Sequence, residues 1–410
     1  MRRLSLSIAG ARCCTASAVF FSPLLHGVLQ MAQSNKPSIV VIGAGIVGLS
    51  AASALAQDAD ITVLEMESQP AYHSSGRSAA TYIEPYDNMT VAQLTMASLA
   101  FFQAPPEGFS NAALVRPRGG LTICPIEQVG VFEAFLRDWT GPCPQLREIS
   151  VDEALAFIPV LRRDYVHRAA IDPMALDLDV HGLISGHRKR VLSAGGRVLT
   201  GQRVTALTHG STWEVQTADG SRFRADIVLN AAGAWGDAVA RLAGVRPVGL
   251  VPKRRTACLI DPPAGVQVAD WPMVHDAISS FYFRPESGRL MVSPADKTPS
   301  EPCDAQAEEL DVATAIDRAQ VAADMPVRHI AHRWAGLRSF VADDKPVNGY
   351  APDVPGFYWL VGQGGFGVQT SPTMARIARH LVLGLDMPAD LLARGLAAAQ
   401  LAPARASLSG

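Results

Sequence analysis

Apolar residues follow one another without polar alternation in a short run near the start of the chain, residues 38–42. A continuous β-branched run of this length is typical of a parallel strand that is buried on both faces. An apolar helix is expected over residues 49–56, and a second apolar run, residues 61–64, predicts another strand that ends in Glu65. The pattern therefore predicts a β-α-β unit.

A glycine-rich turn, residues 43–48, joins the first strand to the helix. Gly43 allows a tight turn, Gly45 lets the backbone approach a pyrophosphate, and Gly48 lets the helix pack on the strand. The helix N-terminus offers free N–H groups and a partial positive charge to phosphates. Glu65, about 20 residues further on, is placed to accept a hydrogen bond from a ribose hydroxyl. We therefore interpret the segment as a dinucleotide-binding unit, with a purely structural turn as the weaker alternative.

Further elements follow from the periodicity of the rest of the chain. Helices are expected over residues 89–103, 128–139 and 151–158, and a strand over residues 120–124. Short runs bounded by turn residues predict a small β-meander at residues 196–199, 204–208, 213–217 and 222–225. An apolar strand is expected at residues 227–230, and a second strand-rich region at residues 256–260, 281–284 and 290–293.

The C-terminal part repeats the pattern of an apolar strand followed by glycines. The strand is expected at residues 357–361, and a glycine-rich turn follows it at residues 362–367. Ser371 before Pro372 is expected to open a helix over residues 373–383, because serine caps helices and proline suits a first turn.

These segments predict two interleaved domains. The cofactor domain is expected to consist of residues 36–90, 180–250 and 345–400, and the substrate domain of residues 91–179 and 251–344. The site should lie between them, at the carboxyl ends of the parallel strands.

Composition narrows the class of protein. The chain has 410 residues and a net charge of −2, so no basic excess indicates a nucleic-acid partner. Its six cysteines show neither a C-x-x-C pair nor metal-ligand spacing, which favours reduced thiols, no metal site and a cytoplasmic location.

Residues 1–35 differ in composition from the rest. Arg2, Arg3 and Arg12 precede an apolar stretch, residues 18–29, that is interrupted by a proline and a histidine. The stretch is too short to span a bilayer. We expect a non-native upstream extension or a disordered leader, with a targeting leader as the alternative, and no transmembrane segment elsewhere.

Longer motifs then identify a family. The segments HSSGRSAA, NAAGAW and GGFG begin at residues 73, 230 and 364, and PKRR, SFY and WAGLRSFVAD begin at residues 252, 280 and 334. Together with the opening unit they resemble the FAD-dependent D-amino-acid oxidase superfamily, and within it the bacterial FAD-dependent D-arginine dehydrogenases. The resemblance implies an α/β fold, more fully an α+β two-domain flavoprotein. Its Rossmann-like FAD-binding domain would be of the glutathione-reductase type, with an interleaved antiparallel-sheet substrate domain.

The resemblance also implies which residues bind FAD. They are Gly43, Gly45, Ile46, Val47, Gly48, Glu65, His73, Ser74, Gly76, Arg77, Ser78, Ala79, Ala80, Val204, Ala232, Gly233, Gly336, Gly364, Gly365, Phe366, Gly367, Val368, Gln369 and Thr370. Some relatives attach the flavin through a cysteine near the last catalytic segment. This chain has no cysteine after Cys303, so noncovalent FAD is expected.

Four residues match the catalytic positions of the family. By similarity, Arg255 and Arg338 hold a substrate carboxylate, which suits the planar, always charged guanidinium group. Tyr86 and Tyr282 would cover the substrate. The alternatives are that each arginine pairs with a buried acid and that each tyrosine is core. Arg254 would point the opposite way on its strand, toward the surface.

Two departures from the D-arginine dehydrogenases concern the substrate side chain. Gly120 stands where those enzymes carry a glutamate that binds the guanidinium, and Thr81 replaces a histidine near the flavin. Arginine specificity is therefore not carried over. Glu84 is an alternative partner for a cationic side chain, or the glycine leaves room for a bulkier or neutral one.

The resulting hypothesis is oxidative deamination of a D-amino acid, by hydride transfer to flavin N5, to a 2-oxo acid and ammonia. The alternatives are a secondary amine of the glycine, sarcosine or proline type, a 2-hydroxy acid, or a flavin-binding protein without turnover. Oxygen or a quinone would be the electron acceptor, and a quinone acceptor would bring the enzyme to a membrane surface.

Overall fold

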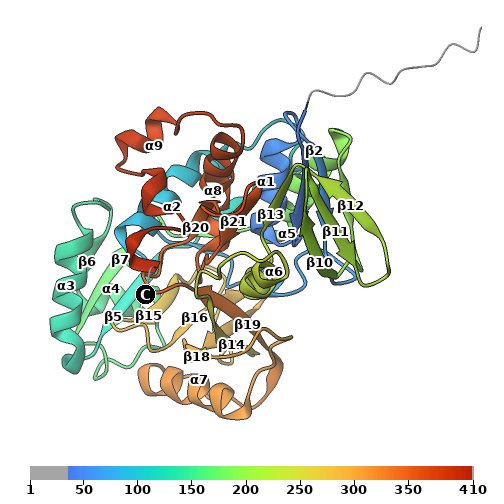
Figure 1. Ribbon diagram of the computed structural model, residues 1–410. Coiled ribbons are helices and arrows are strands. Elements are labelled where there is room, and N and C mark those ends of the chain that lie inside the picture. Colours follow the sequence, from blue (N-terminus) through green and yellow to red (C-terminus); the bar gives the residue numbers. More distant parts are fainter. Residues whose placement is uncertain (1–35, 409–410) are drawn as a thin grey trace, which may run out of the picture. The chain divides into compact units, whose positions relative to one another are not determined.

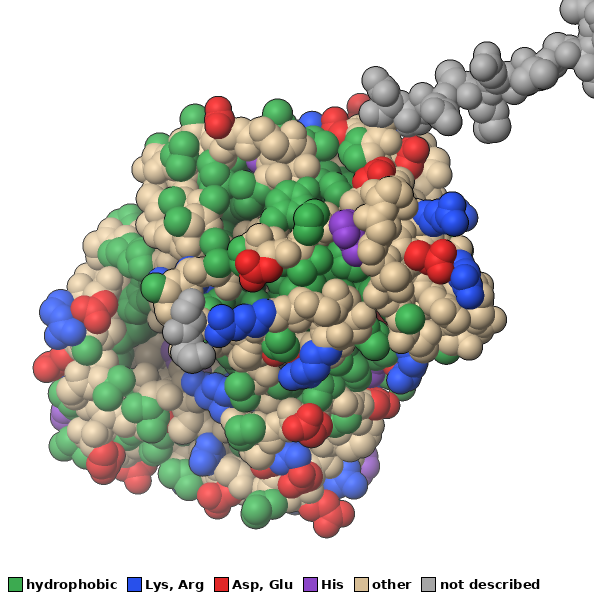
Figure 2. All heavy atoms as spheres, in the orientation of Figure 1, with side chains coloured by type: hydrophobic (Ala, Val, Ile, Leu, Met, Phe, Trp, Pro, Cys, Tyr) green, Lys and Arg blue, Asp and Glu red, His purple; other side chains and the backbone are tan. Residues whose placement is uncertain are grey.

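The structure is a computed structural model, which describes residues 36–408. The predicted leader, residues 1–35, lies outside the described residues. The chain that follows builds its main core on two large sheets (Figure 1). On the face shown in Figure 2, side chains of both charges are scattered over the surface, in keeping with the small net charge of −2.

The first sheet is mostly parallel and contains the predicted β-α-β unit. Its order is β20-β21-β13-β1-β2-β9. The bounds are β1 Ser38–Ile42, β2 Asp60–Leu64, β9 Arg197–Leu199, β13 Ile227–Asn230, β20 Val347–Tyr350 and β21 Phe357–Val361. Only β20 runs antiparallel to its neighbour. Three strands far apart in sequence, β1, β13 and β21, therefore lie side by side in one sheet.

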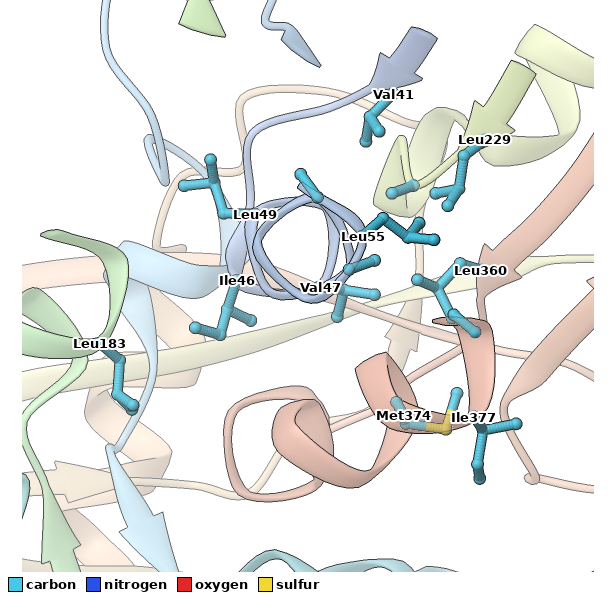
Figure 3. Packing of buried hydrophobic residues seen from close by; sticks show 14 of the residues in the cluster. Val41, Ile46, Val47, Leu49, Leu55, Leu183, Leu229, Leu360, Met374 and Ile377 are labelled. Atoms are coloured by element: carbon cyan, nitrogen blue, oxygen red, sulfur yellow. The ribbon is translucent and has the colours of Figure 1, made fainter. Parts of the chain in front are cut away.

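Helices cover one face of this sheet. They are α1 Ile46–Leu55, α2 Met89–Gln103, α5 Val180–Ser193 and α8 Gly367–Val382. Figure 3 shows Val41, Leu229 and Leu360 of the sheet beside α1, with Met374 and Ile377 of α8 on another side of that helix. Alternate residues of the same strands point to the other face, as the two-residue period of a strand requires.

The opposite face carries a small antiparallel sheet and α6, Gly236–Leu242. The small sheet consists of β10 Val204–His209, β11 Trp213–Thr217 and β12 Arg222–Ala225. The predicted meander is thus confirmed for these strands but is wrong for β9. That strand follows α5 and pairs in parallel with β2. In this pair Thr62 aligns with Arg197 and Leu64 with Leu199.

The second large sheet is mainly antiparallel. Its path is β18-β14-β17-β16-β15-β5-β7-β6, and β19 pairs with β14. The bounds are β5 Gly120–Cys124, β6 Arg147–Ile149, β7 Arg168–Asp172, β14 Val251–Ile260, β15 Met273–Asp276, β16 Tyr282–Glu286, β17 Arg289–Ser293, β18 Thr298–Pro299 and β19 Ile330–Phe340. Helix α7, Glu309–Ala322, packs on it at the bottom of Figure 1.

The remaining elements are short or peripheral. Helices α3 Val129–Trp139 and α4 Val151–Phe157 lie beside the second sheet, and α9 Ala389–Ala393 lies near the C-terminus. A three-stranded sheet joins β3 Thr81–Tyr82, β8 Leu176–Leu178 and β4 Val115–Pro117.

The start of α8 differs from its prediction. The helix begins at Gly367, so Pro372 lies in its interior rather than at its first turn. Proline lacks the N–H that would bond the carbonyl four residues earlier, which here belongs to Val368. The hydroxyl of Ser371 donates to that oxygen at 2.9 Å. Ser371 therefore compensates for the proline instead of capping the helix.

Candidate active site

A single cavity of about 300 Å³ joins the two large sheets. It lies at the carboxyl ends of β1 and β13 and extends to β14, β16 and β19. Most of the residues predicted to bind the cofactor line it: Gly43, Gly45, Ile46, Val47, Glu65, His73, Ser74, Arg77, Ser78, Ala79, Val204, Ala232, Gly233, Gly336, Gly364, Gly365, Gly367 and Val368. The fold thus collects four sequence-distant motifs around one cavity.

The first glycine turn has the geometry of a phosphate site. Gly43 has a φ of 103°, and a β-carbon there would lie 2.5 Å from the carbonyl oxygen of Ala231. Gly45 precedes α1 and makes no side-chain cap, while the N–H of Ile46 donates to the hydroxyl of Ser75 at 3.0 Å. The open helix N-terminus beside the cavity can therefore receive phosphate oxygens.

Glu65 holds this turn in place. One carboxylate oxygen accepts from the N–H of Ala44 at 2.8 Å, and the other accepts from the N–H of Glu67 at 3.0 Å. The side chain is buried but lines the cavity. Because a carboxylate oxygen accepts more than one hydrogen bond, Glu65 keeps capacity for a ribose hydroxyl.

The loop after β2 is held by hydrogen bonds and a ring contact of its own side chains, His73 and Arg77, which also line the cavity. His73 bonds to the carboxylate of Glu67 at 2.9 Å, and its ring lies 4.7 Å from that of Trp235. Arg77 donates to the carbonyl oxygens of Ala305 and Ala335, each at 2.9 Å. His73 is thus already oriented by the carboxylate of Glu67.

Six predicted cofactor residues and one predicted catalytic residue lie outside the lining: Gly48, Gly76, Ala80, Phe366, Gln369, Thr370 and Tyr86. Gly48 lets α1 pack on the turn, since a β-carbon would lie 2.0 Å from the oxygen of Gly43. The amide of Gln369 bonds both backbone groups of Ile83, at 3.0 and 3.1 Å. These residues support the walls of the cavity.

Several lining residues were not predicted, among them Met66, Tyr72, Gln202, Arg203, Trp235, Met291 and Gln363. Trp235 ends the NAAGAW motif, which was the one signal available for it. The Nε2 atom of Gln363 is buried and has no hydrogen-bond partner among the described residues. Such a donor needs an acceptor. The open helix end, Glu65 and Gln363 together fit a dinucleotide cofactor.

The two predicted carboxylate-binding arginines face the same cavity from paired strands. In the antiparallel pair β14–β19, Arg255 aligns with Gly336 and Lys253 with Arg338. Arg255 donates from Nε to the carbonyl oxygen of Asp296 at 2.9 Å. The Cζ atom of Arg255 lies 6.0 Å from the ring centre of Tyr282.

Arg338 has a neutral partner. Its Nη1 donates to the hydroxyl of Tyr86 at 3.3 Å, and no described carboxylate forms an ion pair with it. Burial lowers the pKa of Arg255, and the positive charge of Arg338 lowers it further. The nearest carboxylate to Arg255, that of Asp296, stays 3.9 Å away. Two partly buried guanidinium groups thus repel each other where a ligand anion would neutralise them.

The position of Arg254 differs from the surface position that was expected. It does lie on the opposite side of β14, but its side chain is 15% exposed and therefore largely buried. It forms ion pairs with Asp311 at 2.9 Å and with Glu308. The surface position was wrong because α7 covers that side of the strand.

Comparisons with known proteins identify the chain. The model of the family "DAO: FAD dependent oxidoreductase" matches residues 38–381. The chain belongs to this family. It is 24% identical over 379 residues to the uncharacterized oxidoreductase YurR of Bacillus subtilis (strain 168). This alignment covers 86% of the chain and 97% of that protein. It is also 28% identical over 230 residues to the mitochondrial sarcosine dehydrogenase of Mus musculus, covering 51% of the chain and 24% of that protein.

Solved structures show the same fold. Glycine oxidase from Geobacillus kaustophilus superposes with a TM-score of 0.78 at 18% identity, covering 90% of this chain and 99% of that one. L-proline dehydrogenase from P. horikoshii superposes with a TM-score of 0.77 at 19% identity, and the match covers 90% of this chain and 97% of that one. The predicted two-domain α/β flavoprotein fold and the FAD cofactor are thereby confirmed. The chain is an FAD-dependent oxidoreductase of the DAO family.

Within residues 36–408, none of the helices is both long enough and apolar enough to cross a bilayer.

Proposed function

We propose that this oxidoreductase deaminates a D-amino acid, with Arg255 and Arg338 binding the substrate carboxylate. One observation supports this above all others: two guanidinium groups face the cofactor cavity, and among the described residues Arg338 has no ion-pair partner while Arg255 has only the distant carboxylate of Asp296, at 3.9 Å. Planar guanidinium groups bind a carboxylate through paired hydrogen bonds. The tyrosines Tyr86 and Tyr282 beside them would close over the bound carboxylate.

The chain's own residues orient the substrate. With the carboxylate fixed, the α-carbon is held facing the cofactor end of the cavity, and orientation of this kind lowers the barrier substantially. When bound, FAD supplies the acceptor for the hydride that leaves the α-carbon. The amine loses a proton, and the imino acid is then hydrolysed by water to a 2-oxo acid and ammonia.

No side chain beside the arginines serves as an evident base. The acid and the histidine that line the cavity, Glu65 and His73, belong to its cofactor end and already have hydrogen-bond partners. We therefore infer that the substrate amine loses its proton to water.

A second candidate substrate class is a secondary amine or glycine. It is favoured by the names of similar proteins, which include glycine oxidase, L-proline dehydrogenase and sarcosine dehydrogenase. The same arginines would hold the carboxylate of either class. The D-configuration, and the likeness to the D-arginine dehydrogenase branch, remain part of our proposal.

Anaerobic bleaching of the bound flavin tests the proposal. Holoenzyme is mixed with D-amino acids, L-amino acids, N-methyl amino acids and 2-hydroxy acids, and flavin absorbance is followed. Rapid bleaching by D-amino acids alone is the expected result. Faster bleaching by sarcosine, proline or hydroxy acids would replace the substrate class, and no bleaching by any compound would contradict turnover of such substrates.

The electron acceptor can be assigned with the same holoenzyme. We propose oxygen or a quinone. Reoxidation of the substrate-reduced flavin is followed with dissolved oxygen and with a soluble quinone in separate mixing experiments. Fast reoxidation by the quinone alone would assign a dehydrogenase, and fast reoxidation by oxygen with formation of hydrogen peroxide would assign an oxidase.

A further inference from the structure

A buried arginine lies just outside the cofactor cavity. Arg284 belongs to β16, two residues after Tyr282, and is 4% exposed. Residues two apart on a strand point to the same face of the sheet, and Tyr282 lines the cavity from that face. Met291, the cross-strand partner of Arg284 on β17, also lines the cavity. Arg284 therefore lies behind the cavity wall that these two side chains form.

Two acids compensate the charge of Arg284. Its Nη2 lies 3.0 Å from Oδ1 of Asp177 and 3.3 Å from Oε2 of Glu286. Asp177 is shared, because Arg118 also pairs with it, at 2.5 Å. A buried cation requires such partners. The other terminal nitrogen of Arg284, Nη1, donates to neutral oxygens instead.

These neutral oxygens belong to the loop before β3, Thr81–Tyr82, which contains predicted cofactor residues. Nη1 of Arg284 donates to the carbonyl oxygen of Ala79 and, at 3.3 Å, to the hydroxyl of Thr81. The hydroxyl of Thr81 donates in turn to the same carbonyl oxygen at 3.1 Å. Hydrogen bonds from an ionised donor are about twice as strong as neutral ones. The peptide between Ala79 and Ala80 is therefore firmly oriented.

The loop needs this support because its backbone is strained. Ala80 has a φ of 53°, in the left-handed region, which costs a residue with a β-carbon about 1–2 kcal/mol. The carbonyl oxygen of Ala80 accepts from the N–H of Leu178 at 2.7 Å. The bonds from Arg284 and Leu178 thus hold, from both sides, a turn that alanine does not favour.

The contacts form one chain of hydrogen bonds that ends at the cavity. Arg284 donates to the carbonyl of Ala79, and the N–H of the same peptide, that of Ala80, donates to the hydroxyl oxygen of Ser78 at 3.0 Å. Ser78 lines the cavity, and its hydroxyl proton has no acceptor within residues 36–408. Hydrogen bonds in series polarise one another, so a cation at one end makes the hydroxyl at the other end a stronger donor.

The chain reaches the cavity near the arginine pair. Ala79 packs in the same hydrophobic cluster as Tyr282, and Tyr282 lies beside Arg255. At the phosphate end of the cavity it is another serine, Ser75, that contacts the N-terminus of α1. Ser78 therefore lies toward the part of the cofactor that exchanges electrons with the substrate.

We propose that Arg284 is a positioning residue, which directs the hydroxyl of Ser78 to bound FAD as a hydrogen-bond donor. The proposal concerns the cofactor and holds for either proposed substrate class. The flavin ring gains negative charge when it is reduced, and an oriented donor stabilises that charge. Arg284 and Ser78 should therefore raise both the affinity for FAD and the reduction potential of the bound flavin.

A double-substitution cycle tests this chain without any substrate. Ser78→Ala removes the hydroxyl, Arg284→Met removes the cation, and a third variant combines the two. The dissociation constant of FAD is measured by fluorescence titration of apoprotein, and the reduction potential by dithionite titration against a redox dye. We expect each single substitution to raise the dissociation constant about tenfold and to lower the potential. The combined variant should match Arg284→Met, because either substitution breaks the same chain.

Two further variants separate the charge from folding. Arg284→Lys keeps a cation but not the planar fork that bonds several partners, so the potential should stay near that of the parent while the unfolding midpoint falls. Arg289→Met is the matched control, because this exposed arginine of β17 pairs with Asp261 at 3.0 Å, and it should change neither the potential nor FAD affinity.

Two results would overturn the inference. One is a parent-like potential in Ser78→Ala, which decides the matter even where Arg284→Met does not fold. The other is additivity of the two substitutions, which would show that Arg284 and Ser78 act separately. Neither result affects the proposed deamination, which flavin bleaching by amino acids tests independently.

Discussion

A β-carbon at Gly365 would lie 2.7 Å from Nη1 of Arg338. The same β-carbon would lie 3.0 Å from the hydroxyl oxygen of Tyr86. The turn after β21 therefore packs its backbone directly against the guanidinium that we assign to the substrate carboxylate. The glycine-rich turn shapes the substrate end of the cavity as well as the cofactor end.

Substituting Gly365 should damage catalysis more than stability. In Gly365→Ala the added methyl group displaces Arg338, and an error of about 1 Å in a positioning group can cost about 100-fold in rate. We expect kcat/KM to fall by about that factor while the flavin stays bound. Gly130→Ala, where a β-carbon meets nothing within 4 Å, is the control. Equal kcat/KM in Gly365→Ala and the parent would contradict this close packing in solution.

Removing the charge of Arg338 should abolish most carboxylate recognition. Arg338→Met keeps the length of the side chain, and we expect kcat/KM to fall by about 100-fold or more, because a buried charge-assisted pair is lost. The absorbance spectrum should still report bound flavin. Arg254→Met, on the neighbouring strand β14 and outside the cavity, is the matched control, and it should lower stability without a comparable loss of kcat/KM.

Glu65 should affect both the fold of the turn and cofactor affinity. In Glu65→Gln the amide presents a donor to one of the two N–H groups, of Ala44 or Glu67, that now bond the carboxylate. Leaving one buried N–H unpaired costs about 1–3 kcal/mol. We expect a weaker FAD complex by tenfold or more in fluorescence titration of apoprotein, together with a lower unfolding midpoint. Parent-like values of both would contradict the role of Glu65.

Stability should fall on acidification because of His187. This ring lies between Phe101 and Phe109, with centroid distances of 5.7 and 4.9 Å, and neither nitrogen has a hydrogen-bond partner within residues 36–408. Burial lowers the pKa of His187 to about 3, and the charge of Arg190 adds to the shift. The unfolded value is about 6.5. The stabilising effect of the neutral ring is therefore complete above about pH 6.5 and is lost progressively toward pH 3.

Urea unfolding between pH 7 and pH 4 measures this effect. The free energy of unfolding should decline by up to about 1.4 kcal/mol per pH unit from this residue. His187→Leu, which cannot take up a proton, should show a shallower decline over the same range. Identical slopes in the parent and the variant would show that other groups dominate acid unfolding.

The local sequence pattern predicted much of the cofactor-binding part of this protein. Residues 38–65 specify a strand, a tight glycine turn, a helix and an acid, and each depends on neighbours close in sequence. The structure places these elements as predicted, although α1 begins at Ile46, earlier than expected. Motif resemblance added Arg255, Arg338 and Tyr282, which the fold brings to one cavity.

The sequence by itself determined the short elements, the dinucleotide-binding unit and the types of residue able to bind a carboxylate. Only the tertiary structure decided that β9 joins the parallel sheet, that α7 buries Arg254, and that Ser371 bonds the carbonyl left free inside α8. It alone placed Asp172 opposite Gly120, with a carboxylate oxygen that has no hydrogen-bond partner in the described part of the chain. Local pattern states whether a segment can bury an apolar face or turn sharply. Strand pairing and the partners of buried charges depend on segments far apart in the chain, so no local pattern contains them.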